Sequence, residues 1–172
     1  RPAPGAAANR TFMMSSYSNA YYDSLPKKRM GAGCLFFNEK NEVLLVKPTY
    51  KPVWEIPGGV VEQNESPKQC CQREVRKELG LNRTIGRLLV IDYNTECRPK
   101  TESLMFIFDG GVLEDSDIAA IQLPADELSE FGFFSQAALP EAMTKPLRYR
   151  VLAAWQQYDC GQTVYLEDQM FV

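Results

Sequence analysis

The sequence predicts one α/β domain, and three observations support this fold class. The chain has 172 residues, of which 45% are hydrophobic and 24% charged, a balance typical of a globular protein with a sizeable core. Short apolar segments bounded by turn residues alternate with segments of helical spacing. No internal repeat or low-complexity linker divides the chain, so we expect a single domain.

The N-terminal residues differ in composition from the rest. Residues 1–14 are mostly small and poor in apolar bulk, and we interpret them as a leader or a disordered start. The expected domain therefore covers residues 15–172. Residues 15–26 are rich in Ser and Tyr, which indicates an arm that becomes ordered by packing.

Strand signals follow in order along the chain. The expected strands cover residues 29–37, 42–47, 84–93, 103–108, 131–134 and 163–166. Residues 38–41, Asn-Glu-Lys-Asn, are typical of a hairpin turn between the first two strands. The triplet Asp109-Gly110-Gly111 predicts a turn or a bulge.

Helical signals fall between and after these strands. Ser66 and Pro67 are typical of an N-cap and a first helical residue, and Gly80 suits a left-handed residue after the helix, so a helix is expected over 67–79. A short helical segment is expected over 135–139. A second long helix over 146–158 has its apolar side chains near helical spacing, which predicts that it covers the sheet.

The first of these helices carries two pairs of side chains with the same spacing. Val75 and Leu79 share one face and are expected in the core. Glu74 and Glu78 share another face, so their carboxylates can converge on one point. Two such carboxylates with a backbone carbonyl suit Mg²⁺, which takes oxygen ligands and keeps several waters; Mn²⁺ is possible too. A metal here would bridge diphosphate oxygens and position a water.

A solvated charged face would explain the two glutamates alone, but it would not explain the residues around them. Pro57-Gly58-Gly59 forms a turn signal before the helix, and Glu65 precedes it at a fixed distance. Together this stretch resembles the Nudix box, G-x5-E-x7-R-E-U-x-E-E-x-G-U, in which U is bulky and aliphatic. The positions that match are Gly59, Glu65, Arg73, Glu74, Val75, Glu78, Gly80 and Leu81.

The resemblance carries several implications. It implies an α/β/α sandwich with a mixed sheet, in which residues 59–81 form a loop-helix-loop. It implies a metal-dependent pyrophosphohydrolase that cleaves a nucleoside diphosphate linked to another group, X, by attack of water on phosphorus. The implied metal ligands are the Gly59 carbonyl, Glu74 and Glu78, with Glu74 or an acid outside the box as the base. Glu65 and Arg73 would hold the loop against the helix, and Arg73, counted among the catalytic candidates, could also contact phosphate.

Lys77 is the one departure, because the family has a metal-binding glutamate there. An ammonium cannot bind a metal, so the site is expected to be weaker. Three outcomes follow: one Mg²⁺ held by the remaining acids, a lysine that contacts phosphate in the metal's place, or a nucleotide-binding or regulatory module with reduced catalysis. A lysine that simply points into solvent is the fourth reading. We favour retained hydrolysis.

The acid outside the box is sought in residues 127–134. Glu130, just before the expected strand, is the first choice as metal ligand or base, and Glu127 is the second. The competing interpretation is a solvated acidic loop. A general base must lie within hydrogen-bond reach of the attacking water, which sequence alone does not establish.

The remaining composition excludes several classes. The chain has no histidine, which rules out Ser-His-Asp and Cys-His mechanisms and histidine metal sites. Five cysteines without C-x-x-C spacing argue against a zinc site and a disulfide framework. The net charge of −3 gives no field that attracts duplex nucleic acid.

Partners and location follow from the same composition. No apolar window reaches membrane-spanning length, so no membrane partner is expected, and a cytoplasmic location is the default expectation. The expected partner is a small nucleotide substrate, such as an NTP or a nucleotide sugar. A homodimer is possible, and the N-terminal arm could support it.

Overall fold

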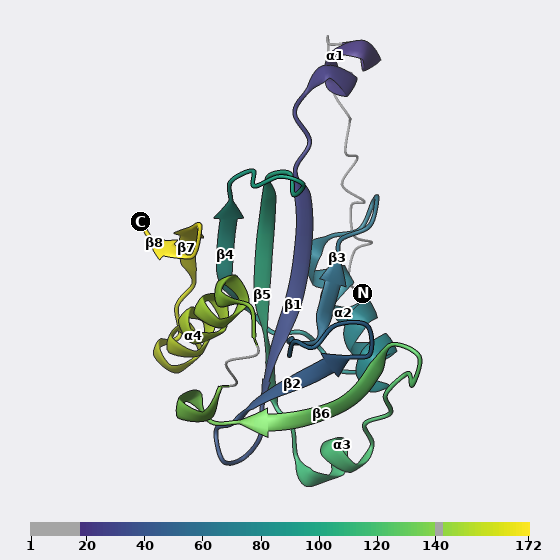
Figure 1. Cartoon of the computed structure of the whole chain (residues 1–172), viewed down its shortest axis with the longest axis vertical. Coiled ribbons are helices and arrows are strands. Elements are labelled where there is room, and N and C mark those ends of the chain that lie inside the picture. The colour runs from purple at the N-terminus through teal and green to yellow at the C-terminus, as the bar shows by residue number, and fades with distance from the viewer. Residues whose placement is uncertain (1–17, 140–142) are drawn as a thin grey trace, which may run out of the picture.

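The computed structural model describes residues 18–139 and 143–172. They form a mixed eight-stranded sheet in the order β6-β2-β1-β5-β4-β7-β8, with β3 paired to β1 beside this path (Figure 1). The strands are β1 (Arg29–Phe37), β2 (Val43–Pro48), β3 (Gly58–Val60), β4 (Leu88–Asn94), β5 (Ser103–Val112), β6 (Leu128–Phe134), β7 (Val164–Glu167) and β8 (Met170–Phe171). The pairs β1–β5 and β4–β7 are parallel, and the others are antiparallel.

Two long helices cover the two faces of this sheet. The helices are α1 (Asn19–Ser24), α2 (Pro67–Leu79), α3 (Asp115–Ala119) and α4 (Lys145–Cys160), with a 3-10 turn η1 (Gln136–Ala138). α2 packs on one face and α4 on the other, and each encloses its own hydrophobic cluster. This arrangement confirms the predicted α/β/α sandwich with a mixed sheet.

Strand β1 shows how the sequence divides the two clusters. Its residues from Gly31 to Phe37 are all buried, as expected for a strand covered on both faces. Cys34 and Phe36 pack in the cluster under α2, whereas Leu35 and Phe37 pack in the cluster under α4. This alternation is the period-two pattern of a strand.

The predicted turns and caps are largely confirmed. The hairpin between β1 and β2 places Asn41 at a φ of 58°. α2 begins and ends at the predicted residues, and η1 lies within the predicted short helical segment. The bulge predicted at the glycine pair is present, because the β1–β5 register passes from Asp109 to Gly111 and skips Gly110. A Cβ at Gly110 would lie 2.5 Å from the Phe36 ring, so only glycine fits this bulge.

Some expected boundaries are wrong. The strand predicted over 84–93 begins only at Leu88, because Gly86 and Arg87 make their backbone hydrogen bonds with Asp109 at the bulge, outside the regular ladder. The strand predicted at 131–134 begins at Leu128, where it pairs with β2. Short elements α1, α3 and β8 were not predicted, and β3 occupies residues interpreted as a turn.

The N-terminal arm also differs from expectation. Residues 1–17, which include the predicted leader, lie outside the described residues. From residue 18 onward the arm forms α1, which buries none of its residues and stands away from the sheet (Figure 1). In the described ranges, no helix is long and apolar enough to cross a membrane. The five cysteines are all free.

Candidate functional site

The predicted box residues meet where β3 and α2 face each other. α2 has a complete capping box: Ser66 accepts from the Gln69 backbone, and the Gln69 side chain accepts from the Ser66 backbone. At its other end Gly80 adopts a left-handed conformation, with φ at 71°, and donates to the Arg76 carbonyl. These caps fix the helix ends and therefore the position of every side chain between them.

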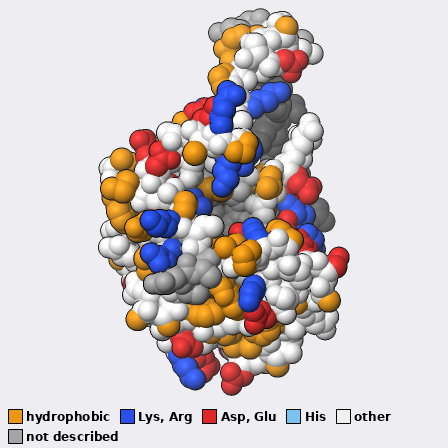
Figure 2. Space-filling model, in the orientation of Figure 1, with side chains coloured by type: hydrophobic (Ala, Val, Ile, Leu, Met, Phe, Trp, Pro, Cys, Tyr) orange, Lys and Arg blue, Asp and Glu red, His pale blue; other side chains and the backbone are white. Residues whose placement is uncertain are grey.

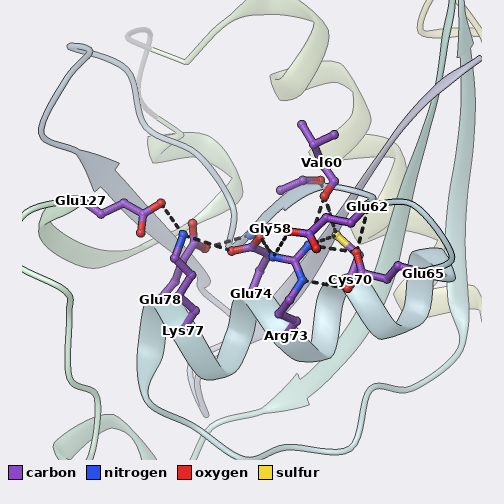
Figure 3. Close-up of polar contacts among 11 residues, drawn as sticks. Gly58, Val60, Glu62, Glu65, Cys70, Arg73, Glu74, Lys77, Glu78 and Glu127 are labelled. Atoms are coloured by element: carbon purple, nitrogen blue, oxygen red, sulfur yellow. Dashed lines mark hydrogen bonds and ion pairs between the residues drawn. The ribbon is translucent and has the colours of Figure 1, made fainter.

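The N-terminal half of the site is a clamp between Glu65 and Arg73 (Figure 3). The Arg73 Nε and Nη2 atoms donate to the two Glu65 carboxylate oxygens at 2.7 and 2.9 Å, the bidentate geometry that suits a guanidinium. Nη2 also donates to the Val60 carbonyl at 3.1 Å, which joins β3 to the helix. The hydrogen bonds from Arg73, and one from the Glu62 backbone, lower the pKa of Glu65 to about 2. This clamp matches the geometric role that the resemblance implied.

Glycines bring the loop backbone against the helix carboxylates. The Gly58 backbone N–H donates to Glu78 Oε2 at 2.9 Å. A Cβ at Gly59 would lie 2.7 Å from Glu74 Oε1, so any other residue would displace that carboxylate. The Gly59 carbonyl, expected as a metal ligand, accepts a weak hydrogen bond from the Cys70 thiol at 3.6 Å. Both glycines thus serve to place loop and carboxylates in direct contact.

The C-terminal half of the site is an acidic cluster of Glu74, Glu78 and Glu127, with Lys77 beside it (Figure 3). Glu74 and Glu78 are 6% and 7% exposed, on the face predicted from their spacing. Lys77 donates from Nζ to Glu127 Oε1 at 2.9 Å, and its Nζ is 3.9 Å from Glu74 Oε2. The pKa of Lys77 is raised, first by the hydrogen bond to Glu127. Lys77 therefore lies among the acids and does not simply point away.

Burial makes Glu78 the unusual member of the acidic cluster. Its pKa is raised to about 8, first because burial disfavours the ionised form. The neighbouring carboxylates of Glu74 and Glu127 raise it further, while the Gly58 N–H and Lys77 act in the opposite direction. The Gly58 N–H and the Lys77 ammonium therefore do not outweigh the effects of burial and of the neighbouring carboxylates on the Glu78 pKa.

The two candidate acids outside the box are separated by the structure. Glu130 lies inside β6, where it pairs across the strands with Lys47 at 2.7 Å and is half-exposed. Glu127, the second choice, reaches Lys77 and the acidic cluster. The sequence offered no signal for this contact, because Lys77 and Glu127 are 50 residues apart.

The donor set fits a single hard cation. Two helix carboxylates suffice for Mg²⁺, which binds through one or two carboxylates and fills its remaining positions with water and phosphate. Within 18–139 and 143–172, no three His, Cys, Asp or Glu side chains form a ready-made metal cage. Lys77 accounts for part of this, because its ammonium stands between Glu74 and Glu127.

Several known proteins are similar to this chain in sequence or in fold. Rat diphosphoinositol polyphosphate phosphohydrolase 2 is 40% identical over 76 residues, which cover 44% of this chain and 42% of that protein. A UDP-X diphosphatase structure is similar, with a TM-score of 0.68 and 20% identity over 83% of this chain and 68% of the other. An ADP-ribose pyrophosphatase from Streptococcus suis 89-1591 has a TM-score of 0.62 and 21% identity over 82% and 99%.

The α/β/α sandwich of this chain is the fold that these two solved structures share. The model of the NUDIX domain matches residues 27–155 of this chain. The chain therefore belongs to the Nudix family. It spans less than half the length of the rat relative.

Proposed function

We propose that the protein is a metal-dependent pyrophosphohydrolase that cleaves a nucleoside diphosphate linked to another group by attack of water on phosphorus. The observation that carries this proposal is the contact of the Gly58–Gly59 backbone with two buried helix carboxylates, Glu78 and Glu74. Two similar structures are named as a UDP-X diphosphatase and an ADP-ribose pyrophosphatase, and the rat relative is named as a phosphohydrolase of diphosphoinositol polyphosphates, which supports the reaction class. The expected substrate is an NTP or a nucleotide sugar.

Glu74 and Glu78 would hold the cation. When bound, Mg²⁺ or Mn²⁺ would offset the charge of the diphosphate and of the leaving group. The glycine loop would act by position, because the missing side chain at Gly59 leaves room for the Glu74 carboxylate beside the loop backbone. Arg73 would act through geometry, since its donors are already engaged by Glu65, Glu74 and Val60.

We propose Glu127 as the proton acceptor for the attacking water. It lies beside the cluster, is less buried than the two helix carboxylates and accepts a hydrogen bond from Lys77, so water can reach it next to the proposed metal ligands. Glu130 stays the alternative from sequence, although its partner is Lys47.

Lys77 would contribute a fixed positive charge to the cluster. Its ammonium lies within 4 Å of Glu74 and bonds Glu127. It would therefore neutralise part of the negative charge of these carboxylates, a role that a second metal ion would otherwise have. We therefore propose a site that works with fewer ions than the full box. The same contact favours the second candidate function, a nucleotide-binding or regulatory module, if the ammonium satisfies the acids without any metal.

Hydrolysis of a substrate panel separates the two functions. Release of phosphate or pyrophosphate would be measured from nucleoside triphosphates, ADP-ribose, and UDP- and ADP-sugars, with Mg²⁺, Mn²⁺ or EDTA. If the protein is a pyrophosphohydrolase, the wild type should show metal-dependent turnover, and Glu78→Gln should abolish it. A silent wild type beside an active Lys77→Glu would instead establish the binding module.

A further inference from the structure

A cavity of about 180 Å³ lies behind the glycine loop, on the face of the sheet that α4 covers. Gly31 and Gly33 of β1 form part of its wall, together with the Gly58–Gly59 backbone. The Met105 and Ile56 side chains pack closely against these two β1 glycines and complete that wall. The opposite wall is formed by Leu147 and Arg150 of α4. The cavity thus joins the catalytic loop to one basic side chain.

Arg150 is held in place by buried partners. Its Nη1 atom donates to Asp92 Oδ2 at 2.8 Å and to Asn94 Oδ1 at 3.2 Å. Asp92 is 0% exposed and is also bound by the backbone and side chain of Gln169. The Arg150 side chain is 12% exposed. Its rotamer is therefore fixed before any ligand arrives, which lowers the entropy lost on binding.

A second cavity of about 530 Å³ adjoins the first, and Arg150 lines both. Among its described lining residues, four are basic, Arg29, Arg98, Lys100 and Arg150, and only Asp168 is acidic. The chain as a whole carries a net charge of −3, so this concentration of basic residues is local. Figure 2 shows basic side chains on this face between the protruding α1 and the middle of the domain. Glu96 and Asp92 offset part of this positive charge, because they pair with Arg98 and Arg150, and the remainder favours anions.

The smaller cavity has one acidic lining residue, Glu55, which Lys51 engages at 2.7 Å. An anion in that cavity would therefore meet the Arg150 guanidinium without an unpaired carboxylate beside it. A guanidinium in a fixed rotamer suits phosphate and carboxylate groups, because its planar fork matches their oxygens.

We propose that Arg150, oriented by Asp92, determines specificity by binding an anionic group, phosphate or carboxylate, that the substrate carries away from the scissile diphosphate. This inference rests on the proposed function, since the diphosphate would lie at the glycine loop. The anionic group can belong to X or to the nucleoside. Two substrate pairs distinguish these sources: UDP-glucuronate with UDP-glucose, and NADPH with NADH.

The first test measures binding without catalysis. Inorganic pyrophosphate would be titrated calorimetrically in EDTA, where the acidic cluster repels the anion and the basic cavity is left to bind it. Arg150→Gln should weaken binding about tenfold and Arg150→Lys about threefold, because lysine keeps the charge but loses the fork. Arg83→Gln is the matched control: Arg83 also pairs with an aspartate, Asp117, but on the far side of the domain, and should bind like the wild type.

Loss of folding in the Arg150 variants would not leave the proposal open. The double variant Arg98→Gln/Lys100→Gln leaves the Asp92 pairing intact and should weaken pyrophosphate binding about threefold. Wild-type affinity in the double variant and in every folded Arg150 variant would overturn the proposal. Thermal unfolding of each variant identifies those that remain folded.

The second test is kinetic. The wild type should prefer, in one substrate pair, the member with the additional carboxylate or phosphate, and Arg150→Gln should reduce that preference about tenfold through KM, with the other member unaffected. Equal loss for both members of both pairs would mean that Arg150 only ties α4 to β4. An absence of all hydrolysis, with Arg150-dependent pyrophosphate binding intact, would instead contradict the proposed function and leave the anion site standing.

Discussion

Glutamates lie near both halves of α2, but their surroundings change their pKa values in opposite directions. At its N-terminal side the clamp joins Glu65 and Arg73 in a bidentate pair and lowers the pKa of Glu65 to about 2. One turn further along, Glu78 is buried beside other acids, and its pKa is raised to about 8. Glu65 in the clamp accepts hydrogen bonds on both carboxylate oxygens, whereas Glu78 in the acidic cluster is buried beside other carboxylates.

This difference distinguishes the clamp, which holds the loop in position, from the acidic cluster, which is proposed to bind the cation. The clamp closes the loop onto the helix without any outside group, so its contribution is geometric. The acidic cluster carries unfavourable interactions that an added cation would relieve. The predictions below act on the clamp, on the acidic cluster or on the acids near β6, and Arg73 belongs to both of the first two because it also bonds Glu74.

The largest expected effect is on turnover in the acidic cluster. Glu74→Gln should lower kcat by at least about tenfold, because an amide is a poorer metal ligand than a carboxylate. Glu62→Gln is the control, since its side chain is 69% exposed and lies 3.8 Å from Arg73. Steady-state kinetics with Mg²⁺ measures both. A Glu74→Gln enzyme with the wild-type kcat would end its catalytic assignment.

The clamp is expected to affect stability. Arg73→Gln should lower the free energy of unfolding, because it leaves the Glu65 carboxylate without its bidentate partner and removes the bond to the Val60 carbonyl. Urea denaturation measures this change. Arg76→Gln, on the exposed side of the same helix, should cost about 0.5 kcal/mol or less. Equal losses in the two variants would mean that the clamp does not hold the loop.

The acid outside the helix offers a finer comparison. Glu127→Gln should lower kcat about tenfold if this carboxylate accepts the proton of the attacking water. Glu130→Gln should have the smaller effect, because Glu130 pairs with Lys47 outside the cluster. The kcat of each variant would be measured on the best substrate across pH. A larger loss in Glu130→Gln would return the role to the residue favoured by sequence.

The smallest expected effects are two opposite slopes of stability with pH in EDTA. The folded pKa of Glu65 lies below its unfolded value of about 4.3, so its contribution is present above that pH and is lost as pH falls towards 2. The folded pKa of Glu78 lies above about 4.3, so stability is lost as pH rises towards 8. Urea denaturation across pH should show that Glu65→Gln removes the first slope and Glu78→Gln the second. Unchanged slopes would refute the contrast.

Local features of the site were predictable from sequence. The capping residues, the glycine turn and the spacing of Glu74 and Glu78 act over a few residues, and the structure places them as expected. The strand boundary at Leu88 was not predictable, because the bulge at Gly110 in the neighbouring strand ends the ladder there. Such pairing depends on a partner that the local pattern does not specify.

Long-range contacts in the site were equally hidden. Lys77 meets Glu127 across 50 residues, and Arg150 meets Asp92 across 58. Sequence identified Lys77 as a departure but left its direction open, and it placed Glu130 ahead of Glu127. Only the sheet, which brings the start of β6 towards the end of α2, determines which acid reaches the cluster.

The most direct test of the contrast within α2 is calorimetric titration of Mn²⁺ into the wild type, Glu78→Gln and Lys77→Glu. If the acidic cluster is the metal-binding half, Glu78→Gln should lose affinity about tenfold or more. Lys77→Glu should gain about as much, because a repelling ammonium becomes a carboxylate. Equal affinity in all three proteins would contradict the account, since neither residue would then face the metal.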